Sequence, residues 1–155
     1  MSNTVKLKKY GDIIVEKVAN AVIRPGDLIQ VMNTGLVRKH PTAGGNVTPK
    51  MFALEDELQG LGIDDDYAAA APVQCWICQP GEVVNARLKD GETIVIGDLL
   101  ESAGTGELQK HVADIESPGI LSVYPNQVVG IANAALDLSG SSGVESTYRL
   151  SVTIV

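Results

Sequence analysis

Cys75 and Cys78 stand at the C-x-x-C spacing that redox dithiols and zinc sites use. A redox pair needs its first cysteine at a helix N-terminus, where the thiolate is stabilised. This pair instead falls in a predicted strand between two prolines, and residues i and i+3 of a strand face opposite sides. A zinc site would need two further ligands at matching spacing, and His40 and His111 are each isolated and distant in the sequence. We therefore expect two buried structural cysteines, not a metal or redox centre.

The acidic triplet Asp64–Asp66 is the second group that could hold an ion. An EF-hand loop alternates its ligands and ends in a bidentate glutamate at its twelfth position, which this segment lacks. A run of like charges is usually a solvated turn. We expect a solvated turn here and no calcium site.

No nucleophile or phosphate-binding motif is recognisable. Ser141 and Ser142 do not form the G-x-S-x-G elbow of a hydrolase, and neither histidine has a predictable acidic partner. Residues 104–106, Gly-Thr-Gly, lack the Lys-Ser/Thr pair that follows a phosphate-binding loop. The sequence therefore predicts no catalytic residue, no cofactor site and no metal site, and hence a protein that is not an enzyme.

The elements that carry these residues are predicted to be strands joined by tight turns. Val84, Ala86 and Leu88 alternate with polar residues, as in a half-buried strand. Residues 89–91, Lys-Asp-Gly, favour a turn, and the β-branched run 93–96 is the expected return strand of a hairpin. A Gly-acid pair followed by two aliphatic residues occurs at 26–29, 81–84 and 97–100. We interpret it as a turn-then-strand device, a local echo and not the period of a solenoid.

Most of the other segments are also predicted to be strands. Strands are predicted at 13–15, 28–32, 36–38, 51–54, 73–78, 120–124, 127–136 and, by the cleanest alternation, 148–155. Residues 108–112 fit either a strand or a helical turn. Residues 48–62 could begin a helix, with Thr48 as N-cap, but we favour a strand at 51–54 followed by a turn or short helix. The loops are expected at 40–46 and 139–143.

Composition is that of a globular β protein. The chain has 155 residues, 45% apolar and 20% charged, with 16 glycines and 4% aromatic residues. We predict an all-β fold, a small single-domain barrel or sandwich over residues 11–155 with at most short helices, preceded by an extended arm at 1–10. The net charge of −7 and the pI near 4.7 argue against nucleic acid as a partner. No apolar run is long enough for a membrane span or a signal peptide, so no membrane partner is expected.

Residues 51–65 and 84–108 carry a family resemblance. The segment MFALEDELQG, continued by Gly62-Ile63-Asp64-Asp65, and the run Val84, Ala86, Leu88, Asp90-Gly91, Gly97-Asp98, Leu100-Glu101-Ser102, Gly104, Gly106 and Leu108 resemble the head decoration (capsid cement) proteins of tailed bacteriophages. The run at 68–71 and the strand containing the two cysteines depart from that pattern.

The resemblance implies a β-tulip-like body that binds the major capsid protein. Such a protein is made in the bacterial cytoplasm, binds the outer surface of the icosahedral virion, commonly as a homotrimer, and stabilises contacts between coat subunits. A basic arm on an acidic body is suited to reaching a neighbouring subunit. The residues expected to contact partners are Val5, Lys6, Leu7, Lys8, Lys9, Tyr10 and Trp76.

Two alternatives come from other classes. Residues 62–67, Gly-Ile-Asp-Asp-Asp-Tyr, are similar to the uracil-binding motif of trimeric dUTPases, which are small all-β enzymes. The arginine-led, glycine-rich tail of that family has no counterpart at 140–143. A fibre or receptor-binding β-module of the virion is the other alternative.

Overall fold

The computed structural model describes residues 13–112, 126–141 and 148–155, and it is all-β with one 3-10 helix, as predicted. The N-terminal half contains β1 (Ile13–Val18), β2 (Leu28–Val31), β3 (Val37–Lys39), β4 (Met51–Ala53), the 3-10 helix η1 (Glu57–Gln59) and β5 (Pro72–Ile77). The C-terminal half contains β6 (Val83–Arg87), β7 (Thr93–Ile94), β8 (Leu99–Ser102), β9 (Leu108–Lys110), β10 (Val128–Ala132), β11 (Leu136–Asp137) and β12 (Arg149–Ile154). The arm at 1–10 and the strand predicted at 120–124 lie outside the described residues.

The N-terminal half forms one five-stranded antiparallel sheet in the order β1-β5-β4-β2-β3. A parallel bridge between Ala19 and Val37 joins the end of β1 to the far edge strand β3, and the Asn20 amide donates to the Val37 carbonyl at 2.7 Å. The sheet therefore closes on itself, which removes an exposed edge at that point. We call this unit the N-terminal barrel.

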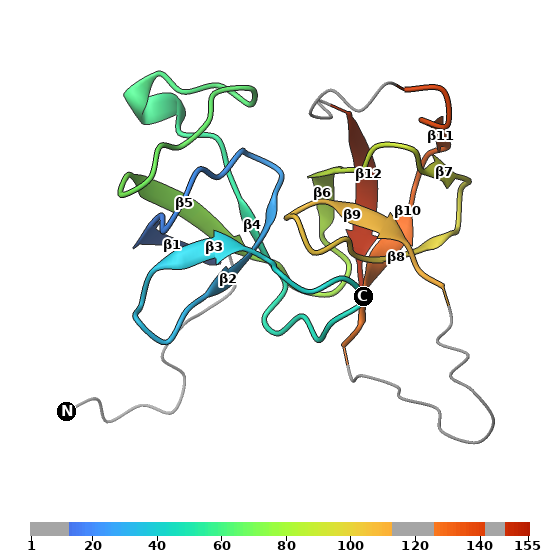
Figure 1. Cartoon of the computed structure of the whole chain (residues 1–155), viewed down its shortest axis with the longest axis horizontal. Coiled ribbons are helices and arrows are strands. Elements are labelled where there is room, and N and C mark those ends of the chain that lie inside the picture. Colours follow the sequence, from blue (N-terminus) through green and yellow to red (C-terminus); the bar gives the residue numbers. More distant parts are fainter. Residues whose placement is uncertain (1–12, 113–125, 142–147) are drawn as a thin grey trace.

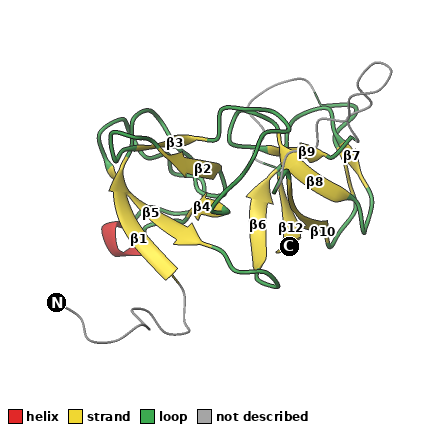
Figure 2. Ribbon diagram, turned by 90° about the horizontal axis from the view of Figure 1, so that it is seen from below, coloured by secondary structure: helices red, strands yellow, loops and turns green. Residues whose placement is uncertain are grey.

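The C-terminal half repeats this topology. Its five-stranded sheet runs in the order β6-β12-β10-β8-β9, so the first, fifth, fourth, second and third long strands are neighbours again. Leu88 bridges Leu108 in parallel, and the Lys89 amide donates to the Leu108 carbonyl at 2.8 Å, so this sheet also closes. We call it the C-terminal barrel. The two barrels lie side by side in both views (Figures 1 and 2).

The sequence carries a trace of the same duplication. When residues 26–40 are placed on 97–111, the identical pairs are Gly26 and Gly97, Asp27 and Asp98, Leu28 and Leu99, Thr34 and Thr105, Gly35 and Gly106, Lys39 and Lys110, and His40 and His111. The backbone agrees, because the amides of His40 and His111 donate to Leu28 and Leu99 respectively, both at about 2.9 Å or less. The Gly-acid segments at 26 and 97 are therefore equivalent positions of a duplication and more than a local echo, although the duplication is not a solenoid.

The three Gly-acid segments are the predicted turn-then-strand device. Each glycine has a positive φ, of 88°, 93° and 91° at Gly26, Gly81 and Gly97, and this backbone conformation is strained for a residue that carries a side chain. Each acid closes the turn twice. Its amide donates to the carbonyl three residues earlier, and its carboxylate accepts from the amide of that same residue, in the pairs Arg24–Asp27, Gln79–Glu82 and Val95–Asp98. The strands β2, β6 and β8 begin at the following residue.

The predicted hairpin over residues 84–96 is wrong. The turn forms at Asp90-Gly91, and Val84, Ala86 and Leu88 point inward as expected. The return strand does not pair with β6, however, because β7 pairs with β11 and β6 pairs with the C-terminal strand β12. The six-residue alternation of β12 offers β6 a longer partner and a buried apolar face, so tertiary pairing prevails over the local turn. The strands predicted at 13–15, 28–32, 36–38, 51–54, 73–78 and 148–155 are all present, and 108–110 is a strand.

Two clusters of buried side chains form the core. One fills the N-terminal barrel with Ile29, Val37, Met51, Val73 and Cys75 among its members. The other fills the C-terminal barrel and also takes in four side chains of the N-terminal half, Leu28, Val47, Phe52 and Cys78. The barrels are thus joined by apolar packing, and a single domain over residues 11–155 stays a prediction.

Candidate interaction surfaces

The two cysteines, Cys75 on β5 and Cys78 directly after it, point to opposite sides. Cys75 belongs to the core of the N-terminal barrel, and Cys78 belongs to the cluster shared with the C-terminal barrel. Both thiols are free and buried, and burial raises their pKa values to about 11 and about 12 respectively. Thiols in this state are poor nucleophiles at neutral pH. The predicted burial of both cysteines is confirmed.

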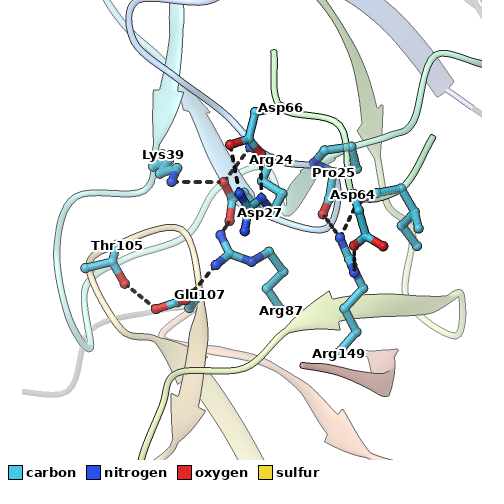
Figure 3. Close-up of polar contacts among 11 residues, drawn as sticks. Arg24, Pro25, Asp27, Lys39, Asp64, Asp66, Arg87, Thr105, Glu107 and Arg149 are labelled. Atoms are coloured by element: carbon cyan, nitrogen blue, oxygen red, sulfur yellow. Dashed lines mark hydrogen bonds and ion pairs between the residues drawn. The ribbon is translucent and has the colours of Figure 1, made fainter. Parts of the chain in front are cut away.

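A buried ion network connects the barrels where β2 meets β6 (Figure 3). Asp27, which directly precedes β2, has no exposed side-chain surface, and the Arg87 guanidinium of β6 donates to its carboxylate at 2.6 Å. Arg87 also pairs with Glu107 at 2.9 Å, and Lys39 lies 3.5 Å from Asp27. Sequence reasoning missed this network because Asp27 and Arg87 are 60 residues apart and no spacing rule connects them.

The acidic triplet adds to the same junction and is not simply a solvated turn. Asp64 accepts from Arg149 at 2.8 Å, and Asp66 pairs with Arg24. Hydrogen bonding to Arg24 lowers the pKa of Asp66. Asp65 instead closes its own turn by accepting from the Gly62 amide at 2.7 Å. All three acids are exposed, as expected of a solvated turn, but the sequence did not show that arginines distant in the chain pair with Asp64 and Asp66.

The dUTPase-like segment is occupied by internal contacts. Tyr67 is 1% exposed, and its hydroxyl donates to the Leu54 carbonyl at 2.7 Å. Asp64 and Asp66 bind the two arginines of the junction. The side chains that resemble a uracil site thus serve the packing of the barrels.

The two histidines are equivalent in the repeat but have different neighbours. His40 is buried, with Nδ1 2.7 Å from the Ser102 hydroxyl and Nε2 3.1 Å from the Asn46 carbonyl, and burial lowers its pKa. His111 Nδ1 lies 2.5 Å from the carboxylate of the buried Glu101. Within the described ranges, no group of three or more His, Cys, Asp or Glu side chains could hold a metal ion.

Of the residues predicted to contact partners, only Trp76 is described; residues 5–10 lie outside the described part of the chain. Trp76 is half-buried on β5 and packs against the shared core cluster. Its cross-strand neighbours are Ile14 on β1 and Phe52 on β4. The structure does not bring it to a fully exposed surface.

A groove lies on the outer face of the N-terminal barrel, between β1 and η1. It encloses about 300 Å³ and is lined by Ile14, Leu54, Glu55, Asp56, Glu57, Leu58 and Gln74. Ile14 is 43% exposed and Leu58 is 100% exposed. We call it the acidic groove.

A second apolar surface lies on the C-terminal barrel, around the turn that precedes β8. Val95, Ile96 and Leu99 are 54%, 70% and 43% exposed. Val112, 70% exposed, follows His111, whose amide donates to the Leu99 carbonyl at 2.8 Å. These four residues form what we call the turn patch. Sequence reasoning missed it, since the run at 93–96 was taken as a paired strand.

Comparison with known proteins adds no family. No protein-family model matches the chain, and no curated protein matches it either. In the described residues, no helix has the length and apolar character needed to cross a membrane.

Proposed function

We propose that this chain is a non-enzymatic capsid cement that binds the outside of a tailed-phage head and stabilises contacts between major capsid subunits. The turn patch is the observation that carries the proposal. Its four aliphatic side chains are exposed, and an exposed apolar surface of this kind can mark a site that a protein partner covers. The family resemblance of residues 51–65 and 84–108 supports the major capsid protein as the partner.

The body has the stiffness that a clamp needs. Two closed barrels share one apolar cluster, and the Asp27–Arg87 pair fixes their junction. A rigid body loses little conformational freedom on binding, so more of the contact energy appears as affinity. Repeated weak contacts over a symmetric shell then sum to tight attachment, and a homotrimer would present three such surfaces at once.

The test uses purified shells that lack the protein. We expect stoichiometric binding of the full-length chain and a higher melting temperature of the shells, measured by calorimetry. Ile96→Ser with Val112→Ser should weaken shell binding while the protein's own melting temperature stays close to wild type, because both side chains are mostly exposed.

Val22→Ser is the matched control, since Val22 is 50% exposed but belongs to the N-terminal half. It should bind shells as the wild type does. Failure of the wild type to bind shells would refute the proposal, and equal binding by both variants would refute the role of the turn patch.

A further inference from the structure

The acidic groove presents two acids that pair with no cation in the described part of the chain. Glu55 and Glu57 are exposed, and among the described residues neither has an ion pair. Between them and β1 lie the aliphatic side chains of Ile14, Leu54 and Leu58. The volume of about 300 Å³ is at the lower limit for small-molecule sites, and it suits one or two side chains of an extended peptide.

The groove is not a necessary product of the barrel fold. Val83 of the C-terminal barrel is the equivalent of Ile14 in the N-terminal barrel. Val83 pairs with Thr153 on β12, and Ile14 pairs with Trp76, which holds the same sheet position on β5. The amides of Leu54 and Asn133 donate to Gln74 and Ser151 in the two barrels. In the second barrel, however, Asn133 Nδ2 donates to the Ser151 hydroxyl at 3.2 Å, so polar groups satisfy each other there.

The chain itself carries a complementary segment. In the arm that precedes β1, Val5 and Leu7 alternate with Lys6 and Lys8. An extended peptide of this pattern has an aliphatic face and a cationic face. The first face matches the groove's aliphatic side chains, and the lysines match Glu55 and Glu57.

The connection to β1 favours the arm of another molecule. Ile14, which lines the groove, is only a few residues from Lys8 and Lys9, so a chain's own arm would have to reverse direction at once to lie beside it. An arm from a second copy needs no reversal. At about 3.3 Å per extended residue, the twelve residues before β1 can reach roughly 40 Å.

We propose that the acidic groove binds the N-terminal arm of a second copy of this chain, with Val5 and Leu7 against Ile14, Leu54 and Leu58 and with the arm lysines against Glu55 and Glu57. This contact is a route to self-association that does not depend on the capsid. An isologous exchange would make a dimer, and a head-to-tail exchange would make a closed ring such as a trimer.

The test is a charge swap between two full-length variants, followed by sedimentation velocity over a range of concentrations. Glu55→Lys with Glu57→Lys reverses the groove, and Lys6→Glu with Lys8→Glu reverses the arm. Each variant alone should raise the dissociation constant for self-association about tenfold or more, since two exposed ion pairs become repulsive contacts. An equimolar mixture should regain association, because each reversed group then meets an opposite charge on the other chain.

Two further variants make the result specific. Leu58→Ser should also weaken association without changing the melting temperature, since this side chain is fully exposed. Lys89→Glu, an exposed reversal on the C-terminal half, should leave association unchanged. Shell binding through Ile96 and Val112 is measured separately, so loss of self-association and loss of shell binding are distinguishable.

Three outcomes would overturn the proposal. A wild type that stays monomeric at every concentration is one. A mixture that associates no better than either variant alone is another. Recovery only when both reversals are on one chain would show that the groove holds the molecule's own arm.

Discussion

Replacing Asp27 with alanine should remove a large part of the protein's stability. The Asp27 side chain is fully buried and accepts from Arg87 Nη1 at 2.6 Å and from the Arg24 amide at 2.9 Å. Its loss takes away the fully buried carboxylate that pairs with Arg87, whose side chain is 4% exposed, and leaves that buried cation with the partly exposed Glu107. Breaking a buried ion pair on one side typically costs about 3–5 kcal/mol, against a total of about 5–15 kcal/mol for a domain.

The repeat provides a matched control in Asp98→Ala. Asp98 is the equivalent residue, and it also accepts from the amide three residues earlier, that of Val95, at 2.9 Å. Its cation is Lys110, which is 45% exposed, so no buried charge is stranded when Asp98 is removed. Both variants lose the turn contact, and the difference between them isolates the burial of the Asp27–Arg87 pair.

Urea unfolding followed by the fluorescence of Trp76, the one tryptophan in the sequence, measures both losses. With a slope of about 2–3 kcal/mol per molar urea, the Asp27→Ala midpoint should fall by about 1–2 M, and the Asp98→Ala midpoint by clearly less. Asp27→Leu combined with Arg87→Met should be less damaging than Asp27→Ala alone, because neither charge remains. Equal losses for Asp27→Ala and Asp98→Ala would refute the reasoning.

Two further predictions concern packing and pH. Gly130→Ala should lower the free energy of unfolding by about 1–3 kcal/mol, because the added Cβ would meet the Val152 side chain and lie 2.6 Å from a backbone oxygen. Gly140 has open space around it, so Gly140→Ala should be nearly neutral in the same thermal melt. Burial raises the pKa values of Cys75 and Cys78 to about 11 and about 12, above the usual 9.0, so both stay protonated in the folded protein while the unfolded chain ionises. These thiols should therefore leave the free energy of unfolding unchanged below pH 9. From pH 9 to about 11, each thiol should lower it by up to about 1.4 kcal/mol per pH unit. A free energy of unfolding that rises over that range would contradict this prediction.

Local features of the fold were predictable from the sequence. The Gly-acid turns follow from a glycine that accepts positive φ and an acid that bonds nearby amides, and β12 follows from strict alternation in residues 148–155. The opposite facing of Cys75 and Cys78 follows from the two-residue period of a strand. Each of these depends only on residues that are neighbours in the chain.

Features that join distant segments were not predicted. The pairing of β6 with β12 and the Asp27–Arg87 contact depend on which surfaces meet after the barrels form. The duplication did leave a signal, since 26–40 and 97–111 share G-D-L and T-G and end in Lys-His. Equivalent residues still differ in burial between the halves, since the side chain of Asp27 is 0% exposed and that of Asp98 is 15% exposed.

Fusing two barrels in one chain fixes their number and their mutual orientation before any assembly begins. A ring of n such molecules presents 2n barrels, of two alternating kinds, while its true symmetry is only n-fold. Within each molecule, the Asp27–Arg87 ion pair joins the two barrels and so helps to set the angle between them.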